Sequence, residues 1–158
     1  MNGSSSTLRT GLPLAGFIIV TFCAPLLGSH ALPGTWYAAL LKPAWNPPAW
    51  IFGPAWTLLY TLMAVAAWLV WRQVGWRRPL LLYGAQLVLN AAWTPIFFGA
   101  HRLGWALLEI VALWFAILLT MLSFRKVNKT AGALFVPYLA WVTFATFLNF
   151  ALWRMNPP

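Results

Sequence analysis

The sequence has very few of the side chains that acid–base, nucleophilic or metal chemistry requires. Its 158 residues include no aspartate, one glutamate, two histidines and one cysteine. A catalytic triad, a carboxylate pair and a metal-binding cluster each need several of these residues close together. The single cysteine, Cys23, has no partner for an intrachain disulfide. We therefore expect neither a hydrolytic nor a metal-dependent enzyme, and no obligatory cofactor.

Charge is also scarce, and this excludes a water-soluble protein. Only 7% of the residues are charged and 62% are hydrophobic, whereas soluble domains carry about 25% charged residues. The apolar runs are continuous over about 20 residues, which indicates spanning helices and not the alternating strands of a barrel. We predict an all-α integral membrane protein that forms one domain over residues 1–158. The five expected spans are about 12–29, 51–71, 80–98, 103–124 and 131–153.

The formal net charge of +9 comes from basic residues in short connections. These suit anionic lipid headgroups and lack the pattern of a nucleic-acid-binding surface, so we expect membrane lipid and not nucleic acid as a partner. One side of the bundle carries Arg9, Arg72, Arg77, Arg78, Arg125, Lys126 and Lys129, and the other carries Lys42, Arg102 and Arg154. We expect a multi-pass protein of a bacterial-type cell membrane. In a membrane served by the usual insertion machinery, this excess predicts a cytoplasmic N-terminus and an opposite C-terminus.

The first apolar segment has two interpretations. It can be a spanning helix, or a cleavable signal peptide made of Arg9, the apolar run and Ser29-His30-Ala31. Cleavage would remove residues 1–31, and both interpretations stand at this point.

Residues 30–50, here called the first loop, have an unusual composition for a connection. Four prolines exclude a long helix, and they are Pro33, Pro43, Pro47 and Pro48. The loop is nevertheless rich in aromatic residues, which favour burial or the membrane interface. We predict that it packs onto the bundle as a lid on the side opposite the cytoplasm. The lid residues singled out are Tyr37, Lys42, Pro43, Pro47 and Pro48.

Polar residues inside membrane spans are candidates for function. Gln86 and Asn90 lie four residues apart on one face of the third span, and Asn90 can bind a ligand or join two helices. For Asn149 we favour a helix–helix hydrogen bond. Thr57 and Thr146 are expected to bond to their own backbone. For Glu109 we favour an ion pair or a bond to a loop over a proton relay, which needs titratable partners.

Twelve tryptophans exceed what an aromatic belt at the membrane surface explains. Trp56, Trp93 and Trp141 lie away from the span ends, and with Tyr60 and Tyr138 they could line a flat cavity. Such a cavity suits a large, planar, apolar ligand, although core packing is the commoner use of tryptophan. Small residues on the third span, at Gly84, Ala85, Ala91 and Ala92, predict a homodimer through close helix approach.

Short motifs occur in a characteristic order along the chain. They are WY at 36–37, LKPAWNPP at 41–48, PAWTLLY at 54–60, Gln86, Asn90, WTP at 93–95, FFG at 97–99, GWAL at 104–107, PYLAW at 137–141, FAT at 144–146 and LN at 148–149. This order resembles the TspO family, also called tryptophan-rich sensory protein, peripheral benzodiazepine receptor or translocator protein. The resemblance spans about residues 12–154.

The resemblance implies a five-helix bundle, usually a homodimer, in which the first loop caps a cavity. It implies porphyrins such as protoporphyrin or haem as ligands, together with isoquinoline and benzodiazepine drugs. The expected function is that of a tetrapyrrole carrier or a stress sensor. The alternatives are a light-dependent porphyrin-degrading enzyme, and a sterol- or lipid-binding regulatory partner.

The expected site consists of the residues at the family's motif positions. Tyr60 is added to them because it belongs to the expected aromatic cavity. The ligand-binding residues are Trp36, Trp45, Trp56, Tyr60, Asn90, Trp93, Trp141, Phe144 and Ala145. Trp56 and Trp141 match tryptophans implicated in the light reaction of some bacterial relatives, so they are the possible catalytic residues. Sterol is the weaker expectation, because Phe150 stands where the mitochondrial cholesterol motif has a tyrosine.

Overall fold

The computed structural model describes residues 3–26 and 33–157, with side chains from residue 12 onward. Every regular element in this part of the chain is a helix, which confirms the predicted all-α class. The elements are α1 (Gly3–Leu26), α2 (Thr35–Ala39), the 3-10 turn η1 (Ala49–Ile51), α3 (Phe52–Val74), α4 (Arg78–Thr94), the π-turn η2 (Pro95–Gly99), α5 (Leu103–Val127), α6 (Lys129–Ala133) and α7 (Val136–Met155).

Four stretches of the described residues are long and apolar enough to cross a membrane. They are Ala49–Val74, Arg78–Gly99, Leu103–Val127 and Lys129–Met155, and they coincide with four of the five expected spans. Within α1 the apolar part is the shorter helix Leu12–Leu26. The rest of the expected first span, residues 27–29, and the sequence Ser29-His30-Ala31 lie outside the described residues.

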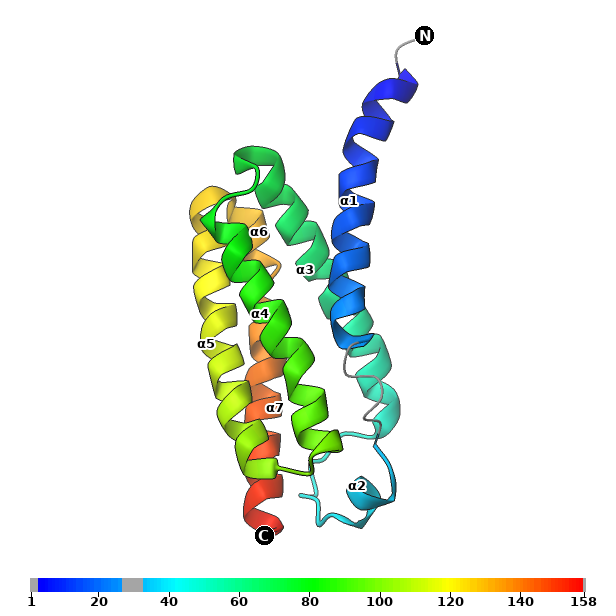
Figure 1. Ribbon diagram of the computed structural model, residues 1–158, viewed down its shortest axis with the longest axis vertical. Coiled ribbons are helices and arrows are strands. Elements are labelled where there is room, and N and C mark those ends of the chain that lie inside the picture. The colour runs from blue at the N-terminus through cyan, green and yellow to red at the C-terminus, as the bar shows by residue number, and fades with distance from the viewer. Residues whose placement is uncertain (1–2, 27–32, 158) are drawn as a thin grey trace.

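The long helices lie side by side, as Figure 1 shows. Helix α4 packs on α5, α5 packs on α7, and α1 packs on α3 and α4. The N-terminal part of α1 projects past the other helices at the end where α6 and the α3–α4 connection lie. At the opposite end lie α2, the α4–α5 connection and the C-terminus. The two groups of basic residues therefore belong to opposite ends of the bundle.

Two prolines lie at helix boundaries. Pro95 ends α4 and begins a π-turn, because a proline removes a backbone donor from the ladder. Pro137 lies inside the fifth span, Lys129–Met155. The span is divided into α6 and α7, and Pro137 occupies the first turn of α7, where a missing N–H costs nothing.

The break between α6 and α7 follows a tight approach between α6 and α5. A Cβ atom added to Gly132 would lie 2.6 Å from the Cβ atom of Arg125. The Asn128 side chain caps α6 by accepting a hydrogen bond from the Ala131 N–H at 2.9 Å. The close packing of α6 on α5 therefore favours glycine at position 132.

The threonines behave as predicted. Thr57 donates to the Gly53 carbonyl at 2.9 Å, and Thr146 donates to the Val142 carbonyl at 2.8 Å. Both hydroxyls are thus satisfied within their own helix.

Candidate ligand-binding site

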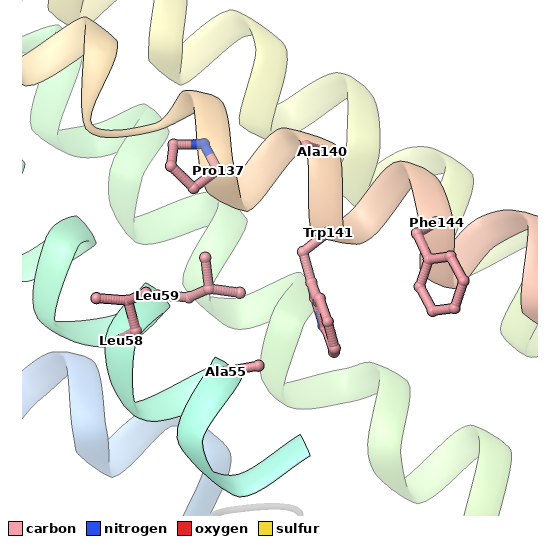
Figure 2. Close-up of a pocket in the computed structure, with 7 residues that line it drawn as sticks. All are labelled: Ala55, Leu58, Leu59, Pro137, Ala140, Trp141 and Phe144. Carbon is pink, nitrogen blue, oxygen red and sulfur yellow. The ribbon is translucent and has the colours of Figure 1, made fainter. Parts of the chain in front are cut away.

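A cavity of about 370 Å³ lies between α3 and α7. It exists because α3 packs mainly against α1 while α7 packs against α5. Figure 2 shows Trp141 pointing from α7 toward Ala55 of α3. The lining residues are Ala55, Leu58, Leu59, Pro137, Ala140, Trp141 and Phe144. All of them are apolar, and the 57% exposure of Leu58 places the opening on the lipid-facing surface of the bundle.

A continuous series of aromatic rings runs from the first loop to the core behind this cavity. Trp45 contacts Phe144 at 5.8 Å between ring centroids, and Phe144 contacts Trp141 at 5.8 Å. Trp141 meets Trp56 edge to face at 6.5 Å. Trp56 in turn stacks on Tyr60 at 5.2 Å with an interplanar angle of 26°. Three of the four contacts are edge-to-face or stacked, the arrangements that aromatic rings favour, and Trp141 and Phe144 are tilted at 46°. The series forms one aromatic wall.

The wall ends in a buried hydrogen-bond network that joins α3, α4 and α7. Tyr60 donates to Asn90 Oδ1 at 2.8 Å, and Asn90 Nδ2 donates to the Tyr138 hydroxyl at 3.0 Å. Tyr138 then donates to Gln86 Oε1 at 3.1 Å. All four side chains are buried. Both polar atoms of Asn90 are therefore engaged between helices, which favours the helix-joining interpretation of this residue.

A second aromatic cluster contains two of the predicted site residues. Trp93 stacks on Phe97 at 4.7 Å and donates to Asn149 Oδ1 at 3.2 Å. Trp36 contacts Phe97 at 6.0 Å and stacks on His101 at 4.1 Å. Neither tryptophan lines the cavity between α3 and α7. The expectation that Trp93 and Trp36 face the same space as Trp141 is not met by this cavity.

Asn149 joins two helices, as predicted. Besides accepting from Trp93, it donates from Nδ2 to the Leu103 carbonyl at 3.0 Å. The bond ties α7 to the first turn of α5.

The described part of the first loop is tied to the C-terminal end of α7 through Leu41. Asn156, just beyond α7, accepts from the Leu41 N–H and donates to the Leu41 carbonyl, both at 2.9 Å. Lys42 Nζ donates to the Ala38 and Leu40 carbonyls at 3.1 and 3.0 Å. The Lys42 ammonium also lies 4.7 Å from the centre of the Tyr37 ring. These contacts hold the ammonium against the loop itself.

Tyr37 is a neutral hydrogen-bond donor within the first loop. Its hydroxyl donates to Asn46 Oδ1 at 3.4 Å. Partial burial raises the pKa of Tyr37 above its ordinary value, against a smaller opposing effect of the Asn46 bond. The ring also contacts Phe98 edge to face at 5.3 Å, so the loop packs onto the π-turn η2.

Of the nine predicted ligand-binding residues, Trp141 and Phe144 line the cavity. Behind the cavity lie Trp56 and Tyr60 in the aromatic wall and Asn90 in the hydrogen-bond network. Trp45 contacts Phe144 from the first loop. Ala145 packs against the core. Sequence reasoning missed the aliphatic lining. Its signal was present on α7, since Pro137 and Ala140 share the helix face of Trp141 at helical spacing.

The interpretation of Glu109 as an ion pair or a loop bond was wrong. Both carboxylate oxygens are buried and have no hydrogen-bond partner among the described residues. The physical reason is distance along the helix, because Arg102 lies seven residues earlier and about 10 Å away along the axis. No group of three potential metal ligands gathers within the residues that the structure describes.

The sequence profile of the TspO/MBR family matches residues 11–154. The translocator protein of Homo sapiens is 41% identical over 153 residues, which are 92% of this chain and 90% of that protein. The tryptophan-rich sensory protein of Cereibacter sphaeroides is 46% identical over 129 residues, or 82% of each chain. The protein CrtK of Rhodobacter capsulatus is 41% identical over 148 residues, covering 90% of this chain and 92% of its relative.

Proposed function

The chain belongs to the TspO/MBR family, and from that membership we propose that it binds planar tetrapyrroles such as protoporphyrin or haem within the membrane. In this role it is a carrier or a sensor of these molecules. The names translocator and sensory protein, carried by its relatives, agree with either role.

The observation that carries the proposal is the apolar cavity between α3 and α7 with its aromatic wall. Ligand sites of this kind are concave and mostly apolar, with volumes of about 300–1,000 Å³. A tetrapyrrole has a flat apolar body that can lie against Trp141 and Phe144, and carboxylate edges that can reach toward the interface. Since the opening faces lipid, the ligand enters sideways from the membrane.

The finer architecture is part of the same proposal. Helix α1 crosses the membrane as the first of five spans. The first loop acts as a lid over the end of the bundle where α2 lies. The N-terminus is on the cytoplasmic side of a bacterial-type cell membrane, because the larger group of basic residues belongs to that end. Trp45 supports the lid role, since it contacts the cavity residue Phe144 from the loop.

Titration of protoporphyrin in lipid nanodiscs, followed by quenching of tryptophan fluorescence, tests the proposal. We expect saturable binding by the wild type. Ala140→Leu fills the cavity and should weaken binding at least tenfold, whereas Ala112→Leu, on a lipid-facing position of α5, should bind as the wild type does. Equal binding by all three proteins would show that the cavity is not the site.

Light-dependent degradation of porphyrin is the second candidate function. It is favoured by the contact of Trp141 with Trp56 and of Trp56 with Tyr60, because adjacent oxidisable rings can pass an electron to a photoexcited ligand. Illumination of the complex in air, with the porphyrin absorption followed over time, separates degradation from binding alone. A sterol ligand has less support, since Phe150 lacks the hydroxyl of the cholesterol motif.

A homodimer through the outer face of α4 completes the proposal. A Cβ atom at Gly84 would meet nothing within 4 Å, and Ala85 and Val88 on the same face are exposed. Ala91, which was expected on this face, is buried in the core, so that part of the prediction was wrong. Gly84→Leu should shift chemical cross-linking in lipid toward monomer, and an unchanged dimer would place the interface elsewhere.

A further inference from the structure

A second cavity lies beside the start of α5, on the surface of the bundle away from α3 and α7. Its volume is about 520 Å³, and its lining residues are Ile96, Ala100, Arg102, Trp105, Leu108 and Glu109. Trp105 and Leu108 are largely exposed, so the cavity opens toward lipid. It combines apolar walls with one cationic and one acidic side chain, which the cavity between α3 and α7 does not have.

Glu109 is the acid of this cavity and the only acid in the sequence. Its carboxylate oxygens are buried without a partner among the described residues. An unpaired carboxylate in an apolar environment is costly unless a cation or hydrogen-bond donor meets it. Among the described residues, the only cationic side chain that lines the cavity is Arg102, and it makes no hydrogen bond to Glu109. Because Glu109 lines the cavity, a change of its side-chain rotamer would turn the carboxylate toward a donor that a bound molecule supplies.

The position of this cavity along the membrane normal matches the headgroup region. A helix of the length of α5, 25 residues, measures roughly 37 Å and exceeds a hydrocarbon core of about 30 Å. The first turn of α5, with Arg102 and Trp105, thus reaches the headgroup layer. Glu109 lies about 10 Å deeper, but side chains of a helix lean toward its N-terminus, which brings the carboxylate toward the same layer.

We propose that this cavity binds a phospholipid with an ethanolamine headgroup. The phosphate of the lipid pairs with Arg102, its primary ammonium donates to the carboxylate of Glu109, and its chains lie along Ile96 and Leu108. A zwitterionic headgroup with N–H donors neutralises the charges of both Arg102 and Glu109. A choline headgroup has no N–H donor, and a glycerol headgroup leaves the carboxylate without a countercharge.

Native mass spectrometry of the full-length protein in detergent, with added lipids of identical chains, tests this proposal. We expect the ethanolamine lipid to bind about tenfold more tightly than the choline or glycerol lipid, as for one charge-assisted hydrogen bond. A series with one and two N-methyl groups should bind progressively more weakly. This series needs no variant, so it stays decisive if a substitution impairs folding. Equal binding of the ethanolamine and choline lipids would overturn the proposal.

Variants assign the two charges separately. Glu109→Gln should abolish the preference for ethanolamine over choline while leaving the choline lipid unaffected. Arg102→Gln should weaken both lipids by a similar factor, because both carry the phosphate. Arg154→Gln is the matched control, since this exposed arginine lies at the same end of the bundle and outside the cavity. A retained preference in Glu109→Gln would refute the role of the carboxylate.

Discussion

Replacing Asn90 by leucine tests the buried network that joins α3, α4 and α7. The substitution removes two hydrogen bonds, one with Tyr60 and one with Tyr138. Hydrogen bonds between membrane helices contribute about 0.6 kcal/mol each on average, so their loss costs about 1.2 kcal/mol. Tyr60 is only 7% exposed, and its hydroxyl also loses its acceptor, at a further cost of about 1 kcal/mol. We expect Asn90→Leu to lower the free energy of unfolding by about 2 kcal/mol.

A double-mutant cycle in mixed micelles, unfolded with a denaturing detergent, measures the effect. Tyr60→Phe in the Asn90→Leu background removes the unsatisfied hydroxyl. The double variant should therefore lose about 1 kcal/mol less than the sum of the two single variants. Thr57→Val is the control, because the Thr57 hydroxyl bonds only to its own helix, and it should change stability little. Strict additivity in the cycle would refute the network.

The same Asn90→Leu protein decides between the two interpretations of this residue. If Asn90 only joins helices, the folded variant should bind protoporphyrin within about threefold of the wild type. A loss of about 1.4 kcal/mol, which is tenfold in affinity, would mean that the amide reaches the ligand.

Three further predictions follow from other contacts. Trp141→Phe keeps an aromatic ring but loses area and the indole, so protoporphyrin affinity should fall about two- to fivefold, and any light-driven bleaching should fall further. Gly132→Ala should destabilise the protein by about 1–3 kcal/mol in the same unfolding assay, because the new methyl group would lie 2.6 Å from the Arg125 Cβ atom. Gly16→Ala is the control and should be tolerated, since its methyl group would meet nothing within 4 Å. Hydrogen exchange through residues 36–46 should be slower than in the α3–α4 connection, and equally fast exchange would contradict a packed first loop.

The helical class and four spans could be predicted because they depend on composition and on the length of apolar runs. The division of the fifth span could not, since the apolar pattern continues through it. The close contact of Gly132 with Arg125 also had no sequence signal, because it arises only when α5 and α6 fold against each other. Pro137 gave an ambiguous signal, because a proline can kink a helix or begin one.

The candidate site, too, could be predicted within one helix but not between helices. The face of α7 that carries Trp141 and Phe144 follows from helical spacing, and both residues line the cavity. The spacing of residues within one helix does not predict which helix packs opposite that face. For this reason Trp93 was expected beside Trp141, whereas the structure places it with Phe97 and Asn149. The missing partner of Glu109 had no sequence signal, because Arg102 lies on nearly the same face.

Asn156 has a practical consequence for how the protein is handled. Its amide holds both backbone groups of Leu41, so the first loop is fastened to a residue close to the C-terminus. A purification tag or fluorescent protein fused at that end would disturb these two hydrogen bonds. Ligand exchange rates measured on such a fusion would then depend on the tag as well as on the loop. Attachment at the N-terminus, where α1 projects past its neighbours (Figure 1), leaves the fastening untouched.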